Sequence, residues 1–170
     1  MNLFPFHSWL VLIHILGVFG FLLAHGVSVG VGFRLRSERD PVRIRALLEL
    51  SNAYLGALYI ALFVLLLGGI LAGISGGWWT SGKLWIWAAV LLLVAIAVGM
   101  YVVALPYFNN VRHAVGVATY DDAKKGLQPP EPAAPAQLEA LLQSSAPIVT
   151  AVIGLGGILL IGWLMVMKPF

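Results

Sequence analysis

Four long apolar stretches alternate with short polar segments along the chain. The apolar stretches cover roughly residues 8–33, 46–74, 83–108 and 144–167. At about 1.5 Å per residue, each is long enough as a helix to cross the roughly 30 Å hydrocarbon core of a bilayer. Lipid offers no partner to a free backbone N–H or C=O, so such a stretch spans as a helix. The pattern predicts an all-α, four-helix transmembrane bundle in a single domain, residues 1–170.

The polar segments between these stretches differ in character. Residues 34–45 are rich in arginine, and Asp40-Pro41 within them is typical of a turn or of the start of a short interfacial segment. Residues 109–125 are polar and are expected to continue the third helix outside the membrane. Residues 126–137 hold four prolines, which predicts an extended, solvated linker. The prolines are Pro129, Pro130, Pro132 and Pro135.

Composition supports lipid as the solvent of this protein. The chain is 61% hydrophobic and 10% charged, whereas soluble domains carry about 25% charged residues. It has no cysteine, which excludes disulfides, thiolate metal ligands and a cysteine nucleophile. The net charge of +3 is small, so no nucleic-acid partner is expected, and the sequence has no hydrolase triad, zinc motif or phosphate-binding loop.

Basic residues predict the orientation of the bundle. Eight of the ten Lys and Arg residues lie in or beside the segments after the first and third stretches. They are Arg34, Arg36, Arg39, Arg43, Arg45, Arg112, Lys124 and Lys125. The positive-inside rule then places both long loops in the cytoplasm and both termini outside, in a bacterial cytoplasmic (inner) membrane. The arginine-rich loop has an alternative role as a platform for anionic lipid head groups or an acidic partner.

Pairs of small residues one helical turn apart recur in three of the stretches. The pairs are Gly26 with Gly30, Gly69 with Gly73, and Ala95 with Gly99. Small side chains let helix backbones approach closely in lipid, so contacts between helices are expected at these positions.

Three histidines mark one face of the first stretch. His7, His14 and His25 are 7 and then 11 residues apart, which turns a helix by roughly 700° and 1100°, within about 20° of whole turns. Ionisable side chains inside a bilayer are costly and usually functional. The simpler alternative is that each neutral imidazole forms a hydrogen bond to a neighbouring helix. Candidate partners are Asn52, Tyr54 and Tyr59.

Haem b is the first cofactor that this histidine pattern suggests. Imidazole is a common axial ligand, and a four-helix bundle offers a cavity between its helices. His14 and His25 are the candidate iron ligands. His113 lies beyond the third stretch and meets a group near His25 only if that helix is long and tilted. One haem with a weak or absent sixth ligand, in a subunit for membrane electron transfer or quinone-side redox chemistry, is therefore the leading hypothesis.

Two further hypotheses stay open. Copper handling would use His7, His14, Met165 and Met167, since imidazole and thioether suit Cu(I). A non-catalytic accessory subunit of a larger respiratory or photosynthetic membrane complex would use the small-residue faces to contact other membrane subunits. Apart from Glu49 at a helix edge, no Asp, Glu, Lys or Arg is embedded within a span, which argues against an ion-coupled transporter. Any enzymatic role would be that of a redox subunit rather than a hydrolase or transferase.

The run HILGVFGFLLAHG and the arginine-rich loop with Asp40-Pro41 also carry a family resemblance. This quarter of the chain resembles DUF2269-type integral membrane proteins and, more loosely, the CopD-like and HemJ-like four-helix families. Those families carry a histidine in the first span, which corresponds to His14. The resemblance implies a four-helix bundle with copper handling (CopD-like) or with haem and protoporphyrinogen oxidation (HemJ-like). The chain has no lysine embedded in its third stretch, where HemJ-like proteins have one.

Overall fold

The structure is a computed structural model that describes residues 4–79 and 82–169. The described part of the chain forms helices, with no strand among them, and four of these are long and apolar enough to cross a membrane. They run His7–Ser37, Pro41–Ser75, Leu84–Ala114 and Pro135–Met167. The prediction of an all-α, four-helix transmembrane bundle is confirmed, and every span is longer than its apolar stretch.

The first two spans are joined by a tight connection. The single turn η1 (Phe4–Phe6) leads into α1 (His7–Ser37), and the second span consists of α2 (Pro41–Ala53) and α3 (Leu55–Ser75). The Asp40 carboxylate accepts a hydrogen bond from the Val42 N–H (2.9 Å) and so caps α2. Proline at the first helical position completes this start, because its missing N–H has no partner there anyway.

The third and fourth spans each contain a short π-helical segment. The third runs α4 (Leu84–Gly99), η2 (Met100–Ala104) and α5 (Leu105–Ala114), followed by the short α6 (Tyr120–Lys124). The fourth runs α7 (Pro135–Leu142), α8 (Ala146–Ala151), η3 (Val152–Gly156) and α9 (Gly157–Met167). Pro106 follows η2 and has no N–H for the carbonyl of Val102, which explains the local widening of the third span.

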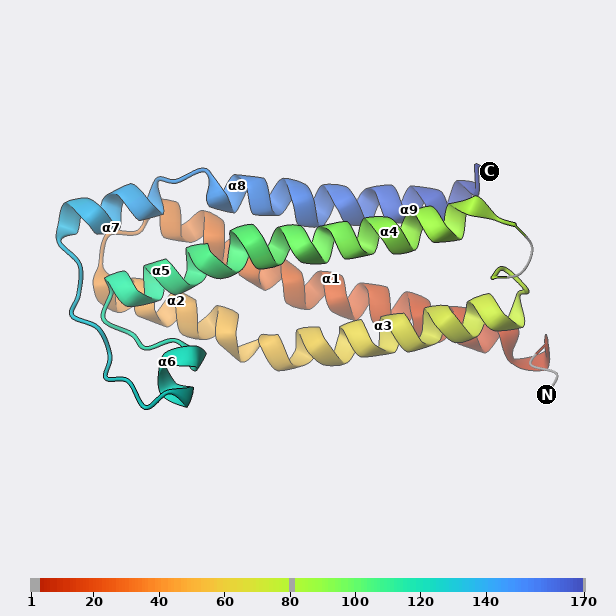
Figure 1. Cartoon of the computed structure of the whole chain (residues 1–170), viewed down its shortest axis with the longest axis horizontal. Coiled ribbons are helices and arrows are strands. Elements are labelled where there is room, and N and C mark those ends of the chain that lie inside the picture. The colour runs from red at the N-terminus through yellow and green to blue at the C-terminus, as the bar shows by residue number, and fades with distance from the viewer. Residues whose placement is uncertain (1–3, 80–81, 170) are drawn as a thin grey trace.

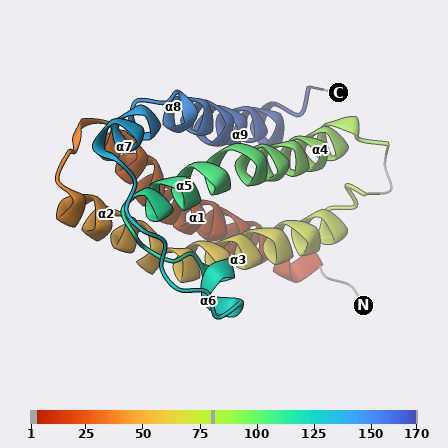
Figure 2. The ribbon, with the colours of Figure 1, turned by 60° about the vertical axis from the view of Figure 1, so that its left-hand side comes forward.

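The spans pack as two pairs. The helix α1 packs along α3, and α4 packs along α9, while the pairs meet mainly where α1 contacts α8 and α2 contacts α5 (Figures 1 and 2). The start of α1 and the end of α9 lie at one end of the bundle, which we call the terminal end. The helices α2, α6 and α7 lie at the other, which we call the arginine-rich end.

Glycines allow the close approach of α1 and α3. A Cβ built on Gly17 would lie 2.5 Å from the backbone nitrogen of Leu65, and one on Gly68 would lie 2.9 Å from the backbone nitrogen of His14. These glycines, rather than the pair Gly26 and Gly30, form the seam. The predicted contact at Gly26 and Gly30 is not made by the described residues, since nothing lies within 4 Å of a Cβ at either position.

The largest buried cluster lies at the arginine-rich end, where α1, α2, α5 and α7 converge. It comprises Val31, Leu35, Ile44, Leu48, Tyr107, Val111, Ala114, Val115, Leu138 and Leu142. Midway along the spans, most large apolar side chains are exposed on the outside of the bundle. Lipid solvates such side chains, whereas the end of the bundle that meets water must bury its own.

Arginine side chains also link the elements of the arginine-rich end. Three of them donate hydrogen bonds to backbone carbonyls of other elements. The pairs are Arg36 with Ser144, Arg45 with Val115 (2.9 Å from Nε), and Arg112 with Leu48 (3.2 Å from Nη2). The arginine-rich segments therefore have a packing role that the topology interpretation did not include.

The proline-rich segment is exposed over most of its length, as predicted, but it contacts the bundle at Ala133. The Ala133 N–H donates to the carbonyl of Ala114 (3.0 Å), and Ala133 packs against the buried cluster. Pro135 begins α7, so the prediction of an extended linker over 126–137 is wrong for residues 135–137. Proline is unfavourable inside a helix but favourable in its first turn, which explains the difference.

Candidate functional site

His7, His14 and His25, the three histidines on one face of α1, are called the stripe histidines. Two of them form hydrogen bonds to the neighbouring helix α3. The Nδ1–H of His14 donates to the carbonyl of Leu65 (2.8 Å). His7 Nδ1 lies 2.7 Å from the Ser75 hydroxyl, which itself donates to the carbonyl of Ala72, so the imidazole is the donor to Ser75. The simpler hypothesis of interhelical hydrogen bonds therefore holds for His7 and His14, although their partners are not the side chains that the sequence suggested.

His25 has a different environment. Its side chain is buried, with 5% of its surface exposed, and its ring stacks on Phe21 with 5.6 Å between centroids. Its Nε2 atom has no hydrogen-bond partner among the described residues and lies against η3, where a Cβ built on Gly154 would be 2.5 Å away. His25 thus faces the fourth span, whereas His7 and His14 face the second.

A partly enclosed cavity of about 840 Å³ begins at His25. It lies between the two helix pairs, towards the arginine-rich end, and its walls come from α1, the junction of α2 and α3, η2, α5 and α8. Residues 118–121 and 123 lie across it at that end. Its volume falls in the range of small-molecule and cofactor sites, about 300–1,000 Å³.

Three of the residues that line this cavity carry a buried polar atom without a hydrogen-bond partner in the described part of the chain. These atoms are His25 Nε2, the Tyr107 hydroxyl and Thr150 Oγ1, from α1, α5 and α8. Tyr107 is 5% and Thr150 is 7% exposed. A fourth such atom in the described residues, Ser144 Oγ, does not line the cavity. Buried polar atoms are nearly always hydrogen-bonded because a missing partner costs about 1–3 kcal/mol, so the grouping of these residues makes the cavity the candidate site.

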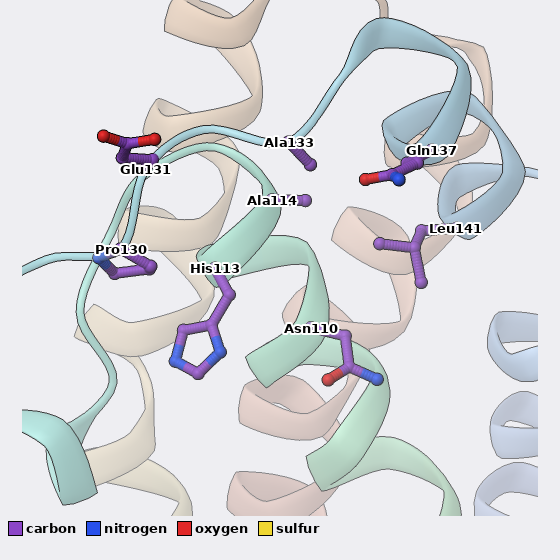
Figure 3. A pocket seen from close by; sticks show the side chains of 8 residues that line it. All are labelled: Asn110, His113, Ala114, Pro130, Glu131, Ala133, Gln137 and Leu141. Atoms are coloured by element: carbon purple, nitrogen blue, oxygen red, sulfur yellow. The ribbon is translucent and has the colours of Figure 1, made fainter.

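His113 belongs to another part of the molecule. It lines a shallow surface pocket of about 430 Å³, where its ring extends from α5 and the Glu131 carboxylate points away from it (Figure 3). Its Nε2–H donates to Asp122 (2.6 Å), which also accepts from the hydroxyl and the N–H of Thr119. The Thr119 hydrogen bonds, and then that of His113, hold the pKa of the Asp122 carboxyl well below its usual range. His113 fastens α6 and does not join His25 at one site.

The candidate copper ligands lie near the terminal end. Lys168, just after α9, places its Nζ 4.9 Å from the centre of the Trp78 ring, which also packs edge-on against His7. The end of α9 is therefore close to His7 in depth. No hydrogen bond joins Met165 or Met167 to an imidazole within residues 4–79 and 82–169, and that part of the chain has no cluster of three or more His, Cys, Asp or Glu. Copper binding stays a prediction.

Sequence reasoning missed Tyr107, Thr150 and Arg112 as cavity residues. Thr150 had a usable signal, because a hydroxyl within an apolar span usually faces a neighbouring helix. Tyr107 lies one residue before the end of the predicted third stretch and Arg112 four residues after it, so both resemble interfacial residues in the sequence. Their position on the cavity wall follows from the continuation of the third span to Ala114.

No protein-family model, curated protein or solved structure matches this chain. The resemblance to DUF2269-type proteins stays a prediction, and the cavity is interpreted from its own residues.

Proposed function

We propose that this protein is a small membrane subunit that binds haem b in the cavity through His25 and takes part in membrane electron transfer. One observation carries the proposal: His25 is the stripe histidine that is buried, lacks a hydrogen-bond partner and lines the cavity. His14 donates its Nδ1–H to a carbonyl, as metal-bound imidazoles often do, but it does not line the cavity.

The residues around His25 fit this group with one adjustment. The Nε2 atom faces Gly154, so the imidazole must turn about its side-chain bonds to direct Nε2 into the cavity that the same ring lines. Met100 of η2 also lines the cavity, and its thioether would supply a second ligand to the iron. Bound haem would supply one-electron chemistry, while the helices would exclude water from it and set its polarity.

Absorption spectra of the purified protein, prepared with haem available and recorded oxidised and reduced, test the proposal. His25→Ala should remove the Soret band while the protein still inserts in the membrane. His14→Ala is the matched control, since it removes an imidazole of the same helix that does not line this cavity. It should keep the band and lower stability by about 1 kcal/mol through the lost interhelical hydrogen bond. A colourless wild-type protein would end the haem proposal.

A colourless protein would favour the second candidate function, an accessory subunit of a larger membrane complex. The observation behind it is that Gly26 and Gly30, one turn apart on α1, lie on its exposed face with no residue within 4 Å of a Cβ. Such a face suits a close contact with a helix of another subunit.

We also propose that the arginine-rich end faces the cytoplasm of a bacterial inner membrane, with both termini outside, because the basic residues gather at that end. Cysteines introduced at Ser37 and Gln128, which are exposed there, should resist an impermeant thiol reagent in intact cells. A cysteine at the exposed Lys83, towards the terminal end, should react. Labelling at Ser37 and protection at Lys83 in sealed cells would reverse the orientation.

A further inference from the structure

Arg112 is a charged side chain on the cavity wall without an ionic partner. It is half-buried on α5, and its Nη2 donates to the carbonyl of Leu48 (3.2 Å). None of the ion pairs in residues 4–79 and 82–169 includes its guanidinium. A guanidinium has five N–H donors, and a charge taken out of water is costly unless it is paired. The unused donors of Arg112 therefore suit an anion in the cavity.

The acidic residues nearby do not supply that anion. Glu49 on α2 is close enough to attract the Arg112 guanidinium but makes no ion pair with it. Asp121 lies on α6 at the rim of the cavity, and both carboxylates are exposed. Charges in contact with solvent are screened by salt, so neither replaces a partner in direct contact.

The rest of the cavity is suited to an apolar chain. From Arg112 back to Met100 the wall follows the third span for about 18 Å, at about 1.5 Å per residue. Leu55 and Leu58 face it from α3, and Leu105 from α5. The helices α3 and α4 do not pack along each other, and Leu105 is 46% exposed on the outer surface. The cavity thus combines an arginine at one end with a mostly apolar wall that borders on lipid.

We propose that this cavity binds an amphiphile with an acidic head, a carboxylate or a phosphate. The head is held by Arg112, and the apolar body lies along η2 and the start of α3. The inference rests on the proposed function in using the same cavity, and the carboxylates of haem would meet the same arginine. The inference covers more ligands than haem, because it requires neither iron nor a ligand to iron.

Photo-crosslinking of the full-length protein tests it. The protein is placed in zwitterionic phosphatidylcholine nanodiscs at mildly alkaline pH, with a photoactivatable long-chain fatty acid or its uncharged methyl ester. Cross-linked peptides are mapped by mass spectrometry, with labelling of the lipid-facing Leu159 and Val166 on α9 as the internal reference. We expect the acid to label the peptides of η2 and the start of α3 about tenfold more than the ester does.

Arg112→Gln should remove this excess, and Arg112→Lys should keep part of it. Arg45→Gln is the matched control, because Arg45 also donates to a backbone carbonyl but does not line the cavity. It should label as the wild type does. Equal labelling by acid and ester in the wild-type protein would overturn the proposal, and that comparison needs no variant to fold. Loss of labelling in millimolar inorganic phosphate would show a site for free anions and would overturn the amphiphile.

The outcomes also separate this inference from the haem proposal. A colourless protein that cross-links the acid in an Arg112-dependent way refutes haem binding and supports the amphiphile site. A Soret band that depends on His25, together with cross-linking that is unchanged in Arg112→Gln, supports haem binding and refutes the acidic-head site.

Discussion

Replacing Gly17 with alanine should lower the stability of the bundle by about 1–3 kcal/mol, the usual cost of overpacking a close contact. A Cβ at this position would lie 2.5 Å from the backbone nitrogen of Leu65 and 2.7 Å from its Cα. Both atoms belong to the backbone of α3, so no side-chain rotation relieves the clash. The two helices must move apart, and the contact that holds His14 against α3 loosens with them.

The measurement is the apparent unfolding temperature in detergent, followed by helix content. Gly26→Ala is the matched control, because it makes the same change on the same helix where nothing lies within 4 Å of the new Cβ. It should leave the unfolding temperature close to that of the wild type. Equal unfolding temperatures for the Gly17 and Gly26 variants would show that the α1–α3 seam does not limit stability.

The number and approximate position of the spans could be predicted because apolar length is a local property of the chain. Their exact ends could not: the sequence predicts that the third helix continues into 109–125 but not that it stops at Ala114, and α2 begins at Pro41, before its apolar stretch, because it packs in the buried cluster of the arginine-rich end. There, residues such as Ile44 and Val111 are buried by partners from other spans. A pattern read along one helix does not contain those partners.

The three histidines share one face of α1, but they do not all contact the same neighbouring helix. His7 and His14 meet α3, but His25 meets η3 of the fourth span. Packed helices cross at an angle, so one stripe leaves one neighbour and meets another as it runs along the helix. The site at His25 therefore depends on Tyr107, Thr150 and the neighbouring spans, and no spacing within α1 reveals it.

The contact between the proline-rich segment and the turn after α5 leads to the second large expected effect, at Gly116. This residue has φ = +73°, a conformation that costs an alanine about 1–2 kcal/mol. A Cβ there would also lie 3.1 Å from Cγ of Pro132 and 3.3 Å from the carbonyl oxygen of Pro130. Gly116→Ala should therefore both strain the turn after α5 and displace the proline-rich segment from its contact with that turn. We expect a stability loss of about 2 kcal/mol or more.

Gly126 separates the two causes. It has a similar φ of +67°, but nothing lies within 4 Å of a Cβ there. Gly126→Ala should thus show the backbone cost alone and a smaller fall in unfolding temperature than Gly116→Ala. Only the Gly116 variant should speed hydrogen exchange at the Ala133 N–H, which the carbonyl of Ala114 protects. If both variants lose the same stability and Ala133 stays protected, the contact between Gly116 and the prolines adds nothing to the fold. The segment would then be held by the Ala133 hydrogen bond and the buried cluster alone.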